Sequence, residues 1–399
     1  MNRMATPIRL LMLDMLSIVP YYTAHLCANL ARESGLQITL VSIPYRHDPD
    51  CFRRQGVRND PGWFDLSSRF RGLPTFMRRV LKVAVYLGNL VALLMQFAGS
   101  RPDIIHVQFL PLASYGLPVE TWFLRVARAL GIKVVYTVHN ILPHDSGRGQ
   151  QGTYRNIYRL ANRLICHDSE AASRVTTGFA VRPEQISVIP HGPLFHPAAE
   201  ISPKAARRRL GFREDECVVL WQGILRPYKG LSFLLEAWRQ VANHRANARL
   251  AIVGVGEDDQ VRAVVEQVSR LELENNVRLE LRFVPLDELT DFYSAADILV
   301  YPYSEITTSG ALMTGIGYGK AIVASALPAF ERILQDGENA LLVPYGEVDA
   351  LAERLERLIG CPQFRQRLAD GLSAKQSAAA GWADIAVRTR ECYRSAISA

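Results

Sequence analysis

The sequence has few cysteines, and none in a pattern that would indicate a zinc site or a disulfide framework. The six are scattered, without a Cys-x-x-Cys pair or nearby histidines at metal-ligand spacing: Cys27, Cys51, Cys166, Cys217, Cys361 and Cys392. Residues 1–20 lack the long apolar core and the small-residue cleavage site of a signal peptide. We therefore expect a protein of the reducing cytoplasm, with neither disulfides nor a zinc site.

A Gly-x-Gly-x-x-Gly motif is also missing after the first strand-like run, residues 8–13, which argues against a nicotinamide dehydrogenase. What the sequence does contain is an ordinary globular balance, with 49% hydrophobic and 21% charged residues over 399 positions. At roughly 150 residues per domain, this length predicts two to three domains.

Positive charge is concentrated in the first half of the chain. The net charge is +7, but residues 1–200 carry 22 basic against 13 acidic residues, whereas residues 201–399 carry 24 against 26. The basic half predicts contact with an acidic lipid surface, a phosphorylated substrate or nucleic acid. No recognisable nucleic-acid motif supports the last of these, and a merely solvated basic surface is the alternative.

Apolar runs of strand length alternate with segments of helical periodicity. In the first half we predict strands at residues 8–13, 37–43, 103–107, 134–138 and 164–167, with helices at 25–33, 119–130, 154–162 and 169–176. In the second half we predict strands at 218–222, 249–253, 277–283 and 298–301, with helices at 231–241, 261–271 and 286–295. Nearly continuous apolar strands that alternate with helices form parallel sheets covered on both faces. We therefore predict an α/β fold of two doubly wound, Rossmann-like domains facing each other across a ligand-binding cleft, with a Pro-rich boundary between 188 and 214.

Residues 80–99 form an apolar segment long enough to span a bilayer, although it contains Lys82, Gly88 and Asn89. Between residues 46 and 82 the sequence carries nine basic and four acidic residues, interleaved with aromatic ones. Basic and aromatic residues beside an apolar helix are typical of a peripheral attachment to an anionic membrane surface. A transmembrane helix and a buried core helix are the alternatives.

The segment WQGILRPYKG, residues 221–230, places two cations after a predicted strand. Gly223 ends that strand, and its missing side chain allows close approach to the backbone. Arg226 and Lys229 follow just before a predicted helix, where they can neutralise a diphosphate. A surface loop with solvated side chains is the alternative.

The segment PYSEITTSGALMTGIGYG, residues 302–319, predicts a helix that starts near Ser309 and Gly310. The free N–H groups of such a start suit a phosphate or a sugar hydroxyl. Simple N-capping by the hydroxyl side chains would explain these residues without a ligand.

In these stretches the chain resembles the retaining, exopolysaccharide-type glycosyltransferases of family 4, which have the GT-B architecture. The resemblance covers nearly the whole chain and is strongest in GILRPYKG, RFVPLDELTDFYSAADILVYPY, TSGALMTGIGYGKAIVAS and DGENALLVPYGEVDALAERL. The run YTVHNILPHD also resembles that of exopolysaccharide β-mannosyltransferases, which invert.

The resemblance implies an amino-terminal acceptor-binding domain at residues 1–195, a donor-binding domain at 210–382, and a helix at 383–399 that packs back onto the first. It implies transfer of a hexose of the mannose or glucose type from a nucleotide diphosphate sugar to a lipid-linked oligosaccharide. The expected enzyme acts at the cytoplasmic face of the membrane and uses neither a metal nor another cofactor.

The resemblance also assigns roles to single residues. Arg226 and Lys229 match the cations on the donor diphosphate, with Gly223, Ser309 and Gly310 around them, and His139 matches a histidine beside the transferred sugar. Tyr21, Tyr22 and Thr23 fall in the loop expected to meet the acceptor or the diphosphate.

The sequence departs from the family pattern at its carboxylates. The Glu-x7-Glu pair would fall at Ile306 and Thr314, and the nearby acid is Glu305. If the enzyme inverts, Asp145 or Asp14 is the candidate base for the acceptor hydroxyl. The missing pair also leaves open a non-catalytic, nucleotide-sugar-binding scaffold subunit of a polysaccharide assembly complex. A soluble acceptor is a further alternative.

Overall fold

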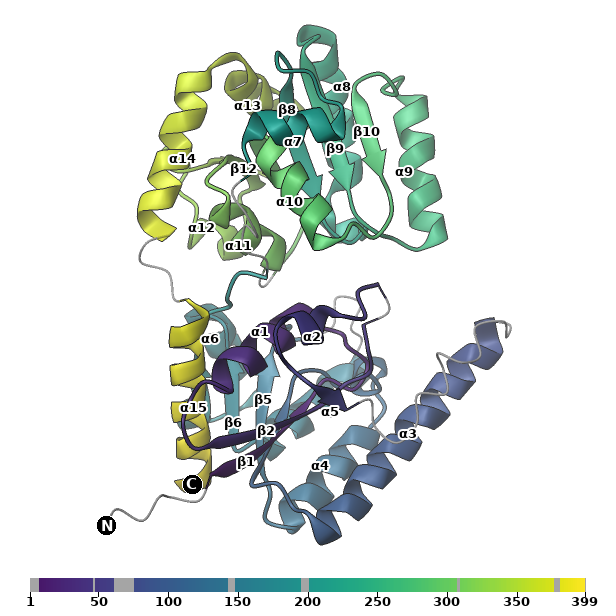
Figure 1. Cartoon of the computed structure of the whole chain (residues 1–399), viewed down its shortest axis with the longest axis vertical. Helices are drawn as coiled ribbons and strands as arrows, with labels where there is room; N and C mark the ends of the chain where they lie inside the picture. Colours follow the sequence, from purple (N-terminus) through teal and green to yellow (C-terminus); the bar gives the residue numbers. More distant parts are fainter. Residues whose placement is uncertain are drawn as a thin grey trace. The chain divides into compact units, whose positions relative to one another are not determined.

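The structure is a computed structural model that describes residues 7–45, 47–60, 75–142, 148–194, 201–306, 309–376 and 381–398. Its contacts divide the chain into an amino-terminal unit, Met1–Gly192 with Ala380–Ala399, and a carboxy-terminal unit, Pro193–Ala379 (Figure 1). Each unit is built on one parallel sheet with helices between its strands. The predicted α/β fold of two Rossmann-like domains is therefore confirmed.

The amino-terminal sheet has seven strands in the order β3-β2-β1-β4-β5-β6-β7, all parallel. They are β1 (Ile8–Leu13), β2 (Leu36–Val41), β3 (Asn59–Asp60), β4 (Ile104–Val107), β5 (Lys133–Val138), β6 (Arg163–Cys166) and β7 (Ile186–Val188). The helices are α1 (Pro20–Leu30), α2 (Cys51–Arg54), α3 (Thr75–Gly99), α4 (Val119–Ala129), α5 (Arg148–Leu160), α6 (Ser169–Phe179) and α15 (Trp382–Ser398). Strands β4, β5 and β6 are almost wholly buried, as in a sheet covered on both faces.

α1 begins earlier than the sequence predicts. Pro20 occupies its first position, where the fixed φ suits a helix and the missing N–H is no loss. Ahead of it, the Asp14 carboxylate accepts hydrogen bonds from the backbone N–H groups of Ile18 (2.9 Å) and Val19 (3.3 Å). Residues 21–23 therefore lie in the first turn of α1, and not in a loop as expected.

α15 is part of the amino-terminal unit although it follows the whole carboxy-terminal unit in the sequence (Figure 1). It packs on α1 and β5. The Tyr393 hydroxyl lies 2.6 Å from Nδ1 of the buried His106, and Arg390 forms an ion pair with Glu33 at 2.6 Å. The core of the first unit thus includes residues from both ends of the described chain.

α3 contains the apolar segment and has two different faces. One face packs in the core through Tyr86, Leu90 and Phe97, and the Tyr86 hydroxyl donates to the buried Glu120 at 3.0 Å. By length and hydropathy, residues Val80–Gly99 could cross a membrane, but only 33% of the most apolar stretch is buried in the unit. Crossing a bilayer would require the packed face to leave the core. The basic and aromatic segment ahead of α3 lies mostly outside the described residues.

The carboxy-terminal sheet has six parallel strands in the order β10-β9-β8-β11-β12-β13. They are β8 (Cys217–Gln222), β9 (Ala248–Val253), β10 (Val277–Glu280), β11 (Ile298–Tyr301), β12 (Ala321–Ser325) and β13 (Leu341–Val343). The helices are α7 (Pro203–Leu210), α8 (Leu231–His244), α9 (Asp258–Arg270), α10 (Leu286–Ala295), α11 (Gly310–Gly317), α12 (Pro328–Glu331), α13 (Val348–Gly360) and α14 (Pro362–Gln376). α7 lies inside the segment interpreted as a turn-rich boundary, because Ser202 and Pro203 start a helix there.

Candidate functional site

The strand order places two of the predicted motifs side by side. The chain runs from β8 outward to β9 and β10, then returns to β11 on the other side of β8, so the order reverses between β8 and β11. In open parallel sheets, ligands bind outside the carboxyl ends of the strands at such a switch point. Here those loops are residues 223–230 and 302–309.

Lys229 places a buried cation at this switch point. Its side chain is 9% exposed, and Nζ donates to the Tyr303 hydroxyl at 3.0 Å and lies 4.8 Å from the centre of the same ring. No carboxylate among the described residues forms an ion pair with it. Burial alone would lower the pKa of Lys229, but Tyr303 and Tyr228 outweigh it and raise the pKa. The ammonium therefore stays charged, and an anionic ligand would supply its missing counter-charge.

Gly223 makes room for this lysine. A Cβ atom at Gly223 would lie 2.8 Å from Nζ of Lys229, closer than such atoms approach in real proteins. On the other side, a Cβ atom at Gly254, after β9, would lie 1.7 Å from the carbonyl oxygen of Gly223. The missing side chain was expected to admit a ligand, but in this structure it admits Lys229.

The two loops also contact each other directly. Gly230 has φ +67°, and a Cβ atom there would lie 1.6 Å from the carbonyl oxygen of Pro302. Beside it, the backbone N–H of Ser304 donates to the carbonyl of Tyr228 at 2.8 Å. Only glycine allows this approach, so the position of Lys229 is fixed by both loops.

α11 starts at Gly310, directly after the second loop, with Ser309 as its N-cap. Ser309 is buried, and its Oγ accepts a hydrogen bond from the N–H of Leu312 at 3.1 Å. The N-cap role considered as the alternative is thus present, and it leaves the earlier N–H groups of the first turn without helical partners. Thr307 and Thr308 lie outside the described residues.

The other predicted donor residues are more exposed. Arg226 is exposed, and no described residue accepts a hydrogen bond from it. Glu305 is exposed as well. Thr314 occupies one of the two positions of the family's carboxylates, but it is fully buried and donates to the Gly310 carbonyl at 2.8 Å. The described switch point thus combines two cations and a helix start.

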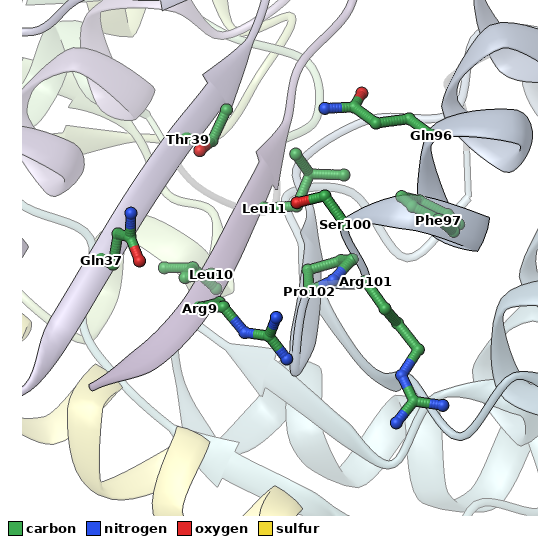
Figure 2. A pocket seen from close by; sticks show the side chains of 10 residues that line it. All are labelled: Arg9, Leu10, Leu11, Gln37, Thr39, Gln96, Phe97, Ser100, Arg101 and Pro102. Carbon is green, nitrogen blue, oxygen red and sulfur yellow. The ribbon is translucent and has the colours of Figure 1, made fainter. Parts of the chain in front are cut away.

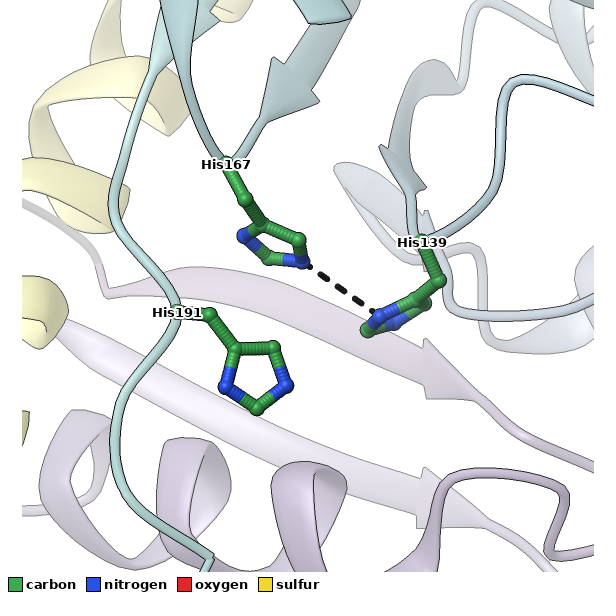
Figure 3. Close-up of side chains that lie close together, drawn as sticks. All are labelled: His139, His167 and His191. Carbon is green, nitrogen blue, oxygen red and sulfur yellow. Dashed lines mark hydrogen bonds between the residues drawn. The ribbon is translucent and has the colours of Figure 1, made fainter. Parts of the chain in front are cut away.

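In the amino-terminal unit, His139 belongs to a cluster that the sequence interpretation did not group. His139, His167 and His191 follow the neighbouring strands β5, β6 and β7 (Figure 3). The Tyr22 ring packs against all three imidazole rings. Burial lowers the pKa of His167 to about 4 and that of His191 to about 3, and it also holds the pKa of His139 well below its usual range. The missed signal was that three adjacent strands each end near a histidine.

Both ring nitrogens of His139 have partners. Nε2 lies 2.9 Å from Oε1 of Gln108, and Nδ1 lies 3.4 Å from Nε2 of His167. A hydrogen bond from His139 to a sugar hydroxyl, as the resemblance implies, would have to replace one of these contacts.

The expected acceptor residues have structural roles in the described part of the chain. Tyr21 donates to Asp48 at 3.0 Å, and Tyr22 is 2% exposed within the histidine cluster. The Thr23 hydroxyl is fully buried and donates to Asp14 at 3.1 Å. Asp14 in turn is 1% exposed and holds the turn before α1, so it does not suit the role of acceptor base. Asp145 lies outside the described residues.

Asp14 predicts a dependence of stability on pH. Burial raises its pKa to about 6, against the hydrogen bonds from Ile18, Thr23 and Val19, which lower it. Since the unfolded carboxyl titrates near 3.9, the folded state is favoured by protonation and loses stability as the pH rises from about 4 to above 6. The unfolding free energy of the wild type relative to Asp14→Asn should fall by up to roughly 3 kcal/mol between pH 4 and 7. Urea denaturation of both proteins at each pH measures this, and a constant difference would contradict it.

Two cavities in the amino-terminal unit lie at different edges of the sheet. One is lined by residues of β1, β2 and the segment after α3, including Arg9, Gln37 and Arg101 (Figure 2). It lies toward the amino ends of the strands, away from the edge where parallel sheets bind ligands. The other is lined mainly by apolar side chains, among them Met15 and Ile43, beside Lys82 of α3. It lies at the carboxyl ends of β1 and β2.

Two doubly wound units, with a terminal helix returned to the first, define the GT-B class of glycosyltransferases. A model described as "Glycosyltransferase Family 4" matches residues 19–192, and one described as "Glycosyl transferases group 1" matches residues 216–360. Together they match about four fifths of the chain. The chain is therefore a glycosyltransferase, and its amino-terminal unit matches the family 4 model.

Relatives of similar sequence include proteins named D-inositol 3-phosphate glycosyltransferase. That of Streptomyces bingchenggensis is 27% identical over 320 residues, which cover 75% of this chain and 69% of the relative. That of Frankia alni is 26% identical over 325 residues, which cover 75% of this chain and 77% of the relative.

Solved structures share the fold at lower identity. Anabaena Alr3699/HepE, in complex with UDP-glucose, is 18% identical with a TM-score of 0.76, over 97% of this chain and 100% of that one. Sucrose-phosphate synthase of Thermosynechococcus elongatus is also 18% identical with a TM-score of 0.76, over 97% of this chain and 98% of that one.

Proposed function

We propose that this glycosyltransferase transfers a hexose, of the mannose or glucose type, from a nucleotide diphosphate sugar to a lipid-linked oligosaccharide in exopolysaccharide biosynthesis. The observation that carries the donor assignment is the buried ammonium of Lys229, which has no carboxylate partner among the described residues. Lys229 lies in the same loop as the exposed Arg226, and the loop between β11 and α11 contacts that loop through Ser304 and Tyr228. The crystallised complex of HepE with UDP-glucose supports this class of donor.

The proposed transfer breaks the bond between C1 of the hexose and the phosphate oxygen, and forms a bond between C1 and the acceptor oxygen. The nucleoside diphosphate leaves with the electron pair. Lys229 and Arg226 stabilise its developing charge, so no metal ion is needed at the diphosphate. Because Asp14 is held in the turn before α1, we propose that the departing phosphate oxygen accepts the proton of the acceptor hydroxyl. Attack and departure on the same face give retention.

The lipid acceptor is supported by the outer face of α3. Its exposed apolar side chains follow a helical stripe, with exposed fractions of 43% for Val83, 55% for Val91 and 61% for Met95. α4, which contacts α3, exposes Trp122 (62%) and Val126 (41%). We propose that this surface, the α3/α4 apolar stripe, attaches the enzyme to the cytoplasmic face of the membrane.

Two observations favour other functions. The names of the inositol phosphate relatives favour a soluble, phosphorylated acceptor. Ile306 and Thr314, in place of the family's carboxylates, favour a subunit that binds the nucleotide sugar without turnover. An assay of nucleoside diphosphate release, with a lipid-linked acceptor, with a soluble phosphorylated acceptor and without an acceptor, distinguishes the three functions. Release that depends on the lipid-linked acceptor supports the proposed function, and release that depends on the soluble one supports the first alternative. No release with either acceptor supports the non-catalytic subunit.

The first test is thermal stabilisation by UDP-, GDP-, dTDP- and ADP-sugars. A ligand that binds only the folded state raises the melting temperature, by the equivalent of about 2.7 kcal/mol at 100 times Kd. We expect one nucleotide series to stabilise the protein, with and without EDTA. If none does so while the protein is folded, the donor site is wrong.

A further inference from the structure

Three imidazole rings from three loops meet in the histidine cluster of His139, His167 and His191 (Figure 3). One ring nitrogen of each lies within 4.8 Å of the other two. His167 is buried and the other two are half-buried, so the cluster is largely shielded from water.

Hydrogen bonds to oxygen fix the tautomer of each ring. In every case one nitrogen faces an oxygen that can only accept, so that nitrogen carries the proton. The pairs are His139 Nε2 with Gln108 Oε1 at 2.9 Å, His167 Nδ1 with the Ile189 carbonyl at 3.1 Å, and His191 Nδ1 with the Gly192 carbonyl at 2.6 Å. The remaining nitrogens, Nδ1 of His139 and Nε2 of His167 and His191, therefore present lone pairs.

Two of these lone pairs face each other closely. Nδ1 of His139 lies 3.4 Å from Nε2 of His167. Two neutral acceptors at this distance repel each other unless a proton or a cation lies between them. Ligands at 2.0–2.1 Å from a tetrahedral zinc ion are roughly 3.3 Å apart. The observed distance therefore matches two ligands of one metal ion.

We propose that the histidine cluster binds one transition metal ion, with zinc as the expected occupant, through His139 Nδ1, His167 Nε2 and His191 Nε2. Three neutral nitrogen ligands favour zinc and its neighbours over magnesium or calcium, which prefer oxygen. The second nitrogen of each ring donates to an amide or backbone oxygen, the arrangement that orients metal-binding histidines. Three protein ligands leave a fourth coordination position open.

Tyr22 and Trp382 form the apolar side of the site. The Tyr22 ring centre lies 4.7 Å from that of His139 and 5.0 Å from that of His191. Trp382 lies 5.3 Å from Tyr22, and a Cβ atom at Gly192 would lie 2.5 Å from the Trp382 ring. A bound ion would hold the ends of β5, β6 and β7 together against α1 and α15. This inference does not depend on the donor assignment, because it rests on the amino-terminal unit alone.

Metal titration of the full chain, purified without a polyhistidine tag and stripped with a chelator, tests the proposal. We expect one equivalent of Zn²⁺ to bind in calorimetry, and Co²⁺ to give the visible ligand-field bands of nitrogen coordination. His191→Gln and His167→Gln should each weaken Zn²⁺ binding at least ~10-fold. His244→Gln is the matched control, because His244 is exposed and pairs with Glu356 on α13.

Two outcomes would overturn the proposal. One is the absence of stoichiometric Zn²⁺ binding and of a Co²⁺ spectrum in the folded wild type, which would mean that the two facing nitrogens share a proton. The other is unchanged binding in a folded His191→Gln variant. Nucleotide-induced thermal shifts, measured on the same metal-free and metal-loaded samples, report separately on the donor site.

Discussion

Lys229→Met should strongly weaken donor binding and turnover while leaving the fold intact. The substitution removes the buried ammonium at the switch point, and with it a charge-assisted contact to the diphosphate. Loss of one group that stabilises the developing charge of the transition state lowers kcat about 10²–10³-fold. Stability should be unchanged or higher, because a buried charge without a carboxylate partner is replaced by an apolar chain of similar length.

Lys320→Met is the control for this prediction. Lys320 lies in the same unit, is half-buried, and donates to the Ser294 carbonyl at 3.0 Å. It precedes the amino end of β12, whereas the switch point lies at the carboxyl ends of β8 and β11. Nucleotide-induced thermal shifts and initial rates of both variants give the result. A Lys229→Met protein that binds the donor as tightly as Lys320→Met would place the diphosphate elsewhere.

Glutamate at three positions of the α3/α4 apolar stripe should release the protein from membranes. Val83, Val91 and Met95 are exposed, so the substitutions leave the core of the unit untouched. Burial of each such side chain in the interface is worth about 1.5–3 kcal/mol, and carboxylates are also repelled by anionic lipids. We expect at least ~100-fold weaker binding of the triple variant to anionic vesicles in sedimentation.

Val265→Glu provides the comparison, because Val265 is 47% exposed on α9 of the other unit. The exposed Arg125 and Arg128 of α4 should make wild-type binding sensitive to salt. Equal sedimentation of wild type and triple variant would exclude this stripe as the attachment surface, and no sedimentation of the wild type would favour a soluble acceptor.

The strands, and the position of the two motifs in the loops that follow β8 and β11, could be predicted because their signals are local. β1 and β11 have the predicted bounds, since each is a continuous apolar run. Arg226 and Lys229 were found because both lie in one short motif. The different burial of the two cations was not visible in the sequence. Lys229 is buried because Gly223, six residues earlier, leaves space for it, and because Tyr303 covers it from the loop after β11.

The histidine cluster could not be predicted in the same way. Its members lie 28 and 24 residues apart in the sequence, and they meet only because β5, β6 and β7 are neighbours in the sheet. β7 has three residues and was not predicted as a strand, so nothing placed His191 beside His167. Conversely, Tyr21 and Thr23 were assigned to an acceptor loop because Pro20 was not recognised as the start of α1.

The position of α15 has a consequence for synthesis of the protein in the cell. The sheet of the amino-terminal unit leaves the ribosome first, but the helix that covers His106 and contacts α1 is made only after the other unit, roughly 190 residues later. At about 5–20 residues per second, this delay is roughly 10–40 s. During that time the surface that will receive Tyr393 and Ile385 is uncovered, whereas the second unit can fold as soon as its own sequence has emerged. Translation arrest or a nonsense mutation before α15 therefore damages the first domain to be made, not the last.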